Sequence, residues 1–311
     1  GNAVIVKPSM DNPLCLLKLV ALSKEAGFPD GVLQCITGVG GKIGPVLASH
    51  PGIDLLSFTG STPCGISSME LAAKTLKPCL LEGGGNDACI VLADADLDLA
   101  VSEAIAGRLL FSGQVCCASK RFLVHNSVRE TFTNKLITAL ESVVCGDPLD
   151  PAVQVGPVIN EEAAKKIEEQ VNRIIEQGGR LLLGGKRNGT FFEITVLTDV
   201  PPTSDVAKDE EIFGPVIPII GFDTTQEAIS IANASSYGLN SCVFSSNASE
   251  AMTVAYAMQA GTAVINGSGL FRSNEMPFGG HKRSGLGTEG TLTSLEECSQ
   301  LKTIVLKNII V

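Results

Sequence analysis

The chain has 311 residues, 44% of them hydrophobic and 18% charged, which suits a globular protein of about two domains. The net charge is -10 and the basic residues are scattered, so no nucleic-acid partner is expected. No apolar stretch reaches the ~18 residues that a membrane span requires, which predicts a soluble, cytoplasmic protein with no membrane partner.

Short β-branched runs alternate with helix-length amphipathic stretches in the first part of the chain. Strands are predicted at 3–7, 31–38 and 53–61, and helices at 12–27, 41–51 and 62–76. The alternation continues with strands at 88–94 and 120–126, helices at 97–113 and 128–144, and two more such pairs after 146–160. This rhythm is typical of an α/β fold with a parallel sheet between helices. The first domain boundary is predicted at 82–86, where a glycine triplet frees the backbone.

Two glycine turns lie where a nucleotide phosphate would meet a strand end and a helix N-terminus. The first turn, with Gly38 and Gly40, departs from the dinucleotide fingerprint and reads equally well as an ordinary turn. The second is the stronger candidate, because Gly60 admits a close approach and Ser61 offers a backbone N–H and a hydroxyl. A plain N-cap serine would look the same.

Ten cysteines are spread along the chain, and most are expected to be reduced, buried thiols. No C-x-x-C occurs and the three histidines are far apart, so no metal site is expected. Cys116 differs because it follows a Gly-Gln turn and precedes two positive charges, an arrangement suited to a nucleophilic thiolate. Glu82, 34 residues earlier at the end of an apolar strand, suits a desolvated general base. Taken singly, a core cysteine and a solvated glutamate explain them as well.

Five motifs occur in an order and at separations that resemble the aldehyde dehydrogenase superfamily: FTGST, LEGGGN, GQVCCA, EEIFGPV and PFGGHKRSGLGTEG. The resemblance runs from Gly1 to Val311. It implies NAD(P)+-dependent oxidation of an aldehyde to a carboxylate through a thioester. The G-Q-x-C nucleophile then falls on Cys116, with Cys117 as an accessory thiol, and the glutamate that activates water falls on Glu82.

The resemblance also implies the remaining site residues and the domains. The expected cofactor-binding residues are Lys7, Ser9, Gly40, Gly60, Ser61, Gly84, Glu211 and Phe213. Arg272 and Phe278 are expected at the substrate. The implied organisation is a partial, Rossmann-like NAD(P)-binding domain at 1–82, an α/β catalytic thiol domain at 83–299 and an oligomerisation strand at 300–311. That strand predicts a homodimer or homotetramer.

Some positions depart from the family pattern. Gly83 and Asn86 replace a packed leucine and a lysine, so we expect the strand that carries Glu82 to be loosened. Met10 stands where a carboxylate favours NAD, which leaves NAD and NADP both open. The family's upstream segment is missing, including an asparagine of its oxyanion hole, so we expect a truncated form of doubtful activity.

Several alternatives remain open at this stage. A coenzyme A-acylating relative is disfavoured by Glu82, and a non-catalytic relative by the retention of Cys116, Glu82 and Glu211. A redox-sensing pair of adjacent cysteines is weaker, because vicinal disulfides are strained. Arg272 favours a small polar or anionic aldehyde, such as a semialdehyde, lactaldehyde or phosphorylated aldehyde, although a surface arginine would look alike.

Overall fold

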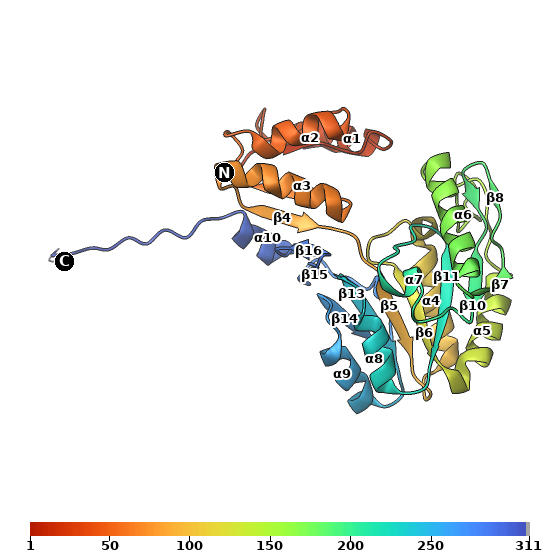
Figure 1. The fold of residues 1–311 in the computed structure, drawn as a ribbon. Coiled ribbons are helices and arrows are strands. Elements are labelled where there is room, and N and C mark those ends of the chain that lie inside the picture. The colour runs from red at the N-terminus through yellow and green to blue at the C-terminus, as the bar shows by residue number, and fades with distance from the viewer. Residues whose placement is uncertain (309–311) are drawn as a thin grey trace.

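The structure is a computed structural model that describes residues 1–308, and it contains two bodies built on separate sheets (Figure 1). The amino-terminal body holds two small sheets. One is the parallel pair β1 (Val4–Val6) and β2 (Leu33–Cys35), and the other contains β3 (Leu56–Thr59) parallel to β4 (Cys79–Glu82). Its helices are α1 (Leu14–Glu25), α2 (Gly40–Ser49) and α3 (Thr62–Ala72), followed by a 3-10 turn at Ala73–Thr75.

The second body is a seven-stranded sheet with strand order β14-β13-β5-β6-β11-β10-β7. All neighbours are parallel except β7, which runs antiparallel to β10. The strands are β5 (Asp87–Val91), β6 (Ser119–His125), β7 (Arg180–Leu183), β10 (Thr195–Thr198), β11 (Val216–Phe222), β13 (Asn240–Phe244) and β14 (Thr262–Ile265). Strands β5 and β13 are buried along their whole length, as expected where helices cover both faces of a parallel sheet.

Alternate side chains of the central strands enter two separate cores. Cys89 and Val91 pack with residues of α4 (Leu97–Leu109) and α5 (Asn126–Leu140) on one face. Ile90 packs on the other face with residues of α6 (Glu161–Glu176), α8 (Thr225–Asn233) and α9 (Ala248–Ala257). The alternation of strands and helices read from the sequence is therefore confirmed, and the fold is α/β.

Short elements complete the chain. They are the 3-10 turn Leu110–Gly113, the hairpin β8 (Arg187–Asn188) and β9 (Phe191–Phe192), α7 (Asp205–Lys208), β12 (Tyr237–Gly238), β15 (His281–Lys282), β16 (Gly285–Leu286) and α10 (Thr291–Glu297). Strand β16 pairs antiparallel with β4, with Gly285 opposite Glu82. The amino-terminal body is thus completed by a segment from the far end of the chain.

The C-terminal segment extends away from both bodies (Figure 1). Residues 301–308 form no strand within this chain, and their apolar side chains, such as Ile304 and Val305, are exposed. The predicted oligomerisation strand at 300–311 therefore has no partner here among residues 1–308, and its pairing with a second subunit stays a prediction. Its last three residues, 309–311, lie outside the described part of the chain.

Among the helices of residues 1–308, none combines the length and the apolar character that crossing a bilayer needs.

Candidate active site

A left-handed turn delivers Cys116 to the start of β6. Phe111, Ser112 and Gly113 have φ angles of 49°, 59° and 76°, a region that residues with a side chain seldom adopt. The Ser112 hydroxyl donates to the carbonyl of Gly156 at 2.8 Å, which holds the turn in place. Strain of this kind persists only where the surroundings impose it, and it is concentrated at functional sites.

Two further contacts fix the same turn. A Cβ atom on Gly113 would lie 2.3 Å from the carbonyl oxygen of Gly214, so the backbone passes where no side chain fits. The Gln114 amide donates to the carbonyl of Phe111 at 2.9 Å, and its oxygen accepts from the N–H of Ile159 at 2.8 Å. The Gly-Gln pair noted in the sequence therefore fixes the backbone that leads to Cys116.

The half-buried thiol of Cys116 is set up to ionise. A hydrogen bond from the Cys117 thiol and the positive charge of Lys120 lower the pKa of Cys116 to about 6, although burial acts in the opposite direction. The same hydrogen bond and burial raise the pKa of Cys117 above its ordinary value. These opposite directions favour the thiolate on Cys116, with the Cys117 thiol as its donor.

Glu82 ends β4 between two strands and is 4% exposed. Thr59 of β3 lies opposite it on one side and Gly285 of β16 on the other. Burial, then the negative charges of Glu289 and Cys116, raise the pKa of Glu82 to about 8. Its Oε2 atom has no hydrogen-bond partner among the described residues. A carboxyl of this kind titrates near neutral pH, where a general base is most effective.

The strand end that carries Glu82 is tightly packed, so the expectation that Gly83 and Asn86 loosen it is wrong. A Cβ atom on Gly83 would lie 2.8 Å from the Thr62 hydroxyl oxygen, and its N–H donates to the carbonyl of Ser284 at 2.6 Å. The Asn86 amide is 1% exposed and donates to the carbonyls at positions 206 and 208 at 2.9 and 2.8 Å. Glycine at position 83 lets the neighbouring segments approach the backbone closely. The hydrogen bonds of Asn86 hold the connection after β4 against the second body.

Glu211 reaches the same place from the loop after α7. Its Oε1 atom is 3.2 Å from Lys120 Nζ and accepts from the N–H of Gly85 at 3.3 Å. A Cβ atom on Gly84 would lie 2.4 Å from the other carboxylate oxygen, so glycine there makes room for Glu211. The Phe213 ring is 43% exposed, with Lys120 Nζ 5.9 Å from its centroid. Three of the predicted cofactor residues, Gly84, Glu211 and Phe213, therefore gather around Cys116.

Gly60 and Ser61 lie beside Glu82, since the N–H of Gly60 donates to the Glu82 carbonyl at 3.0 Å. Ser61 precedes α3 in an extended conformation, and its side chain makes no capping hydrogen bond. The start of a helix and an uncapped serine hydroxyl form an arrangement that fits a phosphate.

The other predicted cofactor residues form a second group, at the carboxyl ends of β1 and β2. The Lys7 ammonium lies 3.4 Å from the carbonyl of Gly38, in the turn that leads to Gly40 at the start of α2. A Cβ atom on Gly40 would meet nothing within 4 Å. The Ser9 hydroxyl accepts from the N–H of Asp11 at 3.3 Å. No hydrogen bond links this group to Ser61 within the described residues.

The two predicted substrate residues contact each other. The Arg272 guanidinium lies over the ring of Phe278 at 4.1 Å, and its Nη2 atom is 3.8 Å from Glu289 Oε2. The phenylalanine is 6% exposed, whereas the arginine side chain is 42% exposed. The positive charge of Arg272 also acts to lower the pKa of Glu82, which places this pair near the predicted base.

The structure adds two residues to which the sequence assigned no role, Asp87 and Glu289, and it identifies Lys120 as the cation that acts on Cys116. Lys120 is one of the two charges that follow the cysteines, and its place at the start of a buried strand was a usable signal. Glu289 lies near Glu82 only through the return of the chain at β16, so sequence spacing gives no indication of it.

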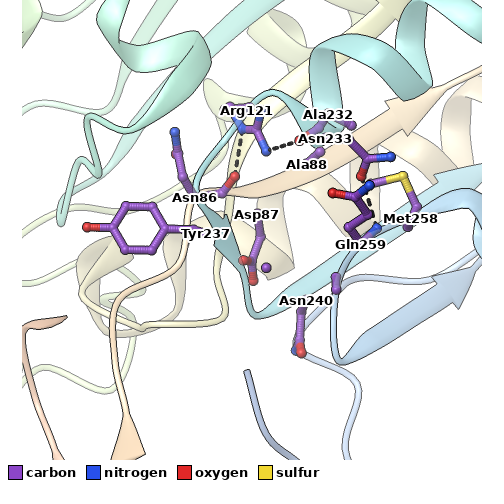
Figure 2. Close-up of a pocket in the computed structure, with 12 residues that line it drawn as sticks. Asn86, Asp87, Ala88, Arg121, Ala232, Asn233, Tyr237, Asn240, Met258 and Gln259 are labelled. Carbon is purple, nitrogen blue, oxygen red and sulfur yellow. Dashed lines mark hydrogen bonds between the residues drawn. The ribbon is translucent and has the colours of Figure 1, made fainter. Parts of the chain in front are cut away.

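Asp87 is a buried carboxyl at the start of β5 (Figure 2). A cavity of about 10 Å³ lies beside it, also lined by Arg121, whose guanidinium donates to the carbonyls of Asn86 and Ala232 at 2.6 and 2.9 Å (Figure 2). Burial raises the pKa of Asp87 to about 7, although the charge of Lys120 lowers it. The site thus holds a second carboxyl that titrates near neutral pH.

Comparison with known proteins identifies the family. A model of the aldehyde dehydrogenase family matches residues 1–304. The chain belongs to the aldehyde dehydrogenase family. Retinal dehydrogenase 2 of Gallus gallus is 42% identical over 311 residues, which are 99% of this chain and 60% of that protein. A 3-sulfolactaldehyde dehydrogenase of Pseudomonas putida is 39% identical over 310 residues, 98% of this chain and 63% of that protein.

Solved structures agree. The crystal structure of an NAD-dependent aldehyde dehydrogenase from Sinorhizobium meliloti superposes with a TM-score of 0.93 at 38% identity, over 96% of this chain and 60% of that one. The chain therefore spans about three fifths of the length of these relatives. The predicted family and fold are both confirmed.

The buried Asp87 predicts a specific pH dependence of stability. Its folded-state pKa of about 7 exceeds the ordinary value of 3.8, so the folded chain binds a proton that the unfolded chain releases between these two pH values. Asp87→Asn removes this effect. We expect its free energy of unfolding, relative to the parent, to rise by more than about 1 kcal/mol between pH 4 and pH 8.

Urea denaturation at both pH values measures this difference. Asp54→Asn, at an exposed carboxyl of the amino-terminal body, controls for the loss of one negative charge. A difference between parent and Asp87→Asn that stays constant from pH 4 to pH 8 would contradict the assignment of a raised pKa.

Proposed function

We propose that the protein oxidises an aldehyde to the carboxylic acid with NAD(P)+, through a thiohemiacetal and then a thioester on Cys116. The observation that carries the proposal is the pairing of a thiol whose pKa is lowered to about 6 with a buried carboxyl whose pKa is raised to about 8. The first is a ready nucleophile at neutral pH, and the second is a base for the hydrolytic step.

The residues present fit the cofactor. The start of α3 and the uncapped hydroxyl of Ser61 suit a pyrophosphate, and the open space beside Gly40 suits a group that lies close to the backbone. Lys7 and Glu211 supply a donor and an acceptor for ribose hydroxyls, and the exposed ring of Phe213 supplies an apolar wall. When bound, the nicotinamide accepts the hydride that leaves the substrate carbon.

The first half of the reaction belongs to Cys116. Its thiolate attacks the aldehyde carbon, and the carbonyl oxygen becomes the oxyanion of a thiohemiacetal. Collapse of this oxyanion re-forms the C=O bond as the hydride departs, which leaves a thioester on Cys116. The rigid turn at 111–113 keeps the sulfur in one position during both steps.

The second half belongs to Glu82. Its carboxylate takes a proton from a water molecule whose oxygen attacks the thioester carbon. Cleavage of the C–S bond releases the carboxylate product and restores the thiolate of Cys116. The position of Glu82 between β3 and β16 holds the base beside the thioester and limits the access of other water.

The two cysteines are predicted to differ in function. Cys116→Ser should abolish aldehyde-dependent reduction of NAD+ or NADP+, a fall of about 10³-fold or more, because a serine hydroxyl stays protonated at neutral pH. Cys117→Ser should keep most of the activity, because a hydroxyl still donates to the thiolate. Absorbance of the reduced cofactor measures both variants, and equal losses would refute the assignment of Cys116 as the nucleophile.

We further propose that the substrate is a small polar or anionic aldehyde. The Arg272 guanidinium lies over the Phe278 ring and its side chain is 42% exposed, so its donors are accessible to a carboxylate, sulfonate or phosphate group. The relative named for 3-sulfolactaldehyde supports this, because that aldehyde is an anion. The relative named for retinal does not support an anionic substrate.

The anchor predicts a selective loss of catalytic efficiency. Arg272→Ala should lower kcat/KM for succinic semialdehyde by about 30-fold, or ~2 kcal/mol, and leave kcat/KM for benzaldehyde nearly unchanged. Arg187→Ala is the control, because that arginine also pairs with a glutamate, Glu168 at 3.1 Å, in another part of the protein. Equal losses of kcat/KM on both aldehydes, or none, would reject Arg272 as the anchor.

A further inference from the structure

Lys120 is a buried ammonium at the start of β6 that the reaction scheme does not use. Its residue is 1% exposed and its side chain carries no accessible area. A buried charge is costly unless it is paired and hydrogen-bonded. Its partners therefore indicate why a lysine is kept at this place.

Those partners join the two halves of the site. The ammonium lies 3.2 Å from Glu211 Oε1 and donates to the backbone carbonyl of Cys116. It also faces the ring of Phe213, 5.9 Å from the centroid. One cation thus bridges the turn that presents the nucleophile and the carboxylate expected at the cofactor.

The charged and titratable groups around the Cys116 thiol come from several elements: Cys117 just before β6, Lys120 on β6, Asp87 on β5, Glu82 on β4 and Glu211 after α7. The charge of Lys120 favours the thiolate, and the negative charge of Glu211 opposes it. A carboxylate and a thiolate therefore compete for the stabilisation that one ammonium provides.

We propose that Lys120 is a positioning residue, a counter-ion shared by Cys116 and Glu211, so that the reactivity of the thiol depends on what Glu211 binds. The proposal rests on the roles given above to Cys116 and Glu211. A ligand whose hydroxyl groups donate to the Glu211 carboxylate disperses its charge, and the ammonium then acts more strongly on the thiolate. By linkage, an ionised thiol also favours that ligand.

Alkylation of Cys116 by iodoacetamide tests this without aldehyde or cofactor. The rate is followed by peptide mass spectrometry from pH 5 to pH 9, with the exposed Cys298 as an internal reference in every sample. Lys120→Met should slow alkylation of Cys116 at pH 7 by about tenfold and move its pH profile upward by about one unit. Lys120→Arg should stay within about threefold of the parent.

Glu211→Gln provides the opposite arm. Without the competing carboxylate, the charge of Lys120 stabilises the Cys116 thiolate more strongly. Alkylation of Cys116 at pH 7 should therefore become severalfold faster, and its pH profile should move to lower pH. Lys77→Met is the matched control, because that buried lysine donates to the carbonyls of Ala48 and His50, both at 2.9 Å, in the amino-terminal body. It should leave both measurements unchanged.

The outcomes are separable. An unchanged pH profile in Lys120→Met, or slower alkylation in Glu211→Gln, overturns the shared counter-ion. Should Lys120→Met not fold, the Lys120→Arg and Glu211→Gln arms decide alone. Because alkylation needs no turnover, a protein that fails to oxidise aldehydes still reports on Lys120, and a failed alkylation result leaves the oxidation assay untouched.

Discussion

Three glycines between β4 and β5 impose the constraint on which the site depends. A Cβ atom would lie 2.8 Å from the Thr62 hydroxyl at Gly83, and 2.4 Å from Glu211 Oε2 at Gly84. At Gly85 it would lie 2.8 Å from the carbonyl oxygen of Cys116. The backbone can therefore cross between the two bodies while elements from distant parts of the chain approach it directly. Glu82, Glu211 and Cys116 come close to one another because the glycines of this crossing have no side chains that would hold the segments apart.

The crowding also creates the electrostatics. Glu82 and Asp87 are buried where the bodies meet, so their carboxyls resist ionisation and their pKa values rise to about 8 and about 7. The thiol of Cys116 behaves oppositely, because Cys117 and Lys120 stabilise its anion. A carboxyl that titrates near neutral pH therefore lies near a thiol whose pKa is lowered. Local partners, rather than burial alone, decide which group carries charge.

The sequence predicted the α/β alternation because hydrophobic periodicity is a local property, and strands such as β5 and β6 form where expected. The roles proposed for Cys116 and Glu82 came from motifs, which are also local. The pairing of Lys120 with Glu211 and the place of Glu289 were missed because they depend on contacts between distant segments. The prediction that Gly83 loosens its strand was wrong for a related reason. A missing side chain weakens packing only where no other segment fills the space.

The roles of Cys116 as the nucleophile and Glu82 as the general base can be tested together with an activated ester, because both groups act on it without a cofactor. With p-nitrophenyl acetate, the thiolate should release p-nitrophenolate as it becomes acylated, and Glu82 should activate the water that removes the acetyl group. The measurement is a stopped-flow absorbance trace of p-nitrophenolate for the parent and for Glu82→Gln. We expect steady turnover in the parent, and in Glu82→Gln a burst of one equivalent of p-nitrophenolate followed by a stall. Loss of the burst, or undiminished turnover in Glu82→Gln, would contradict these roles.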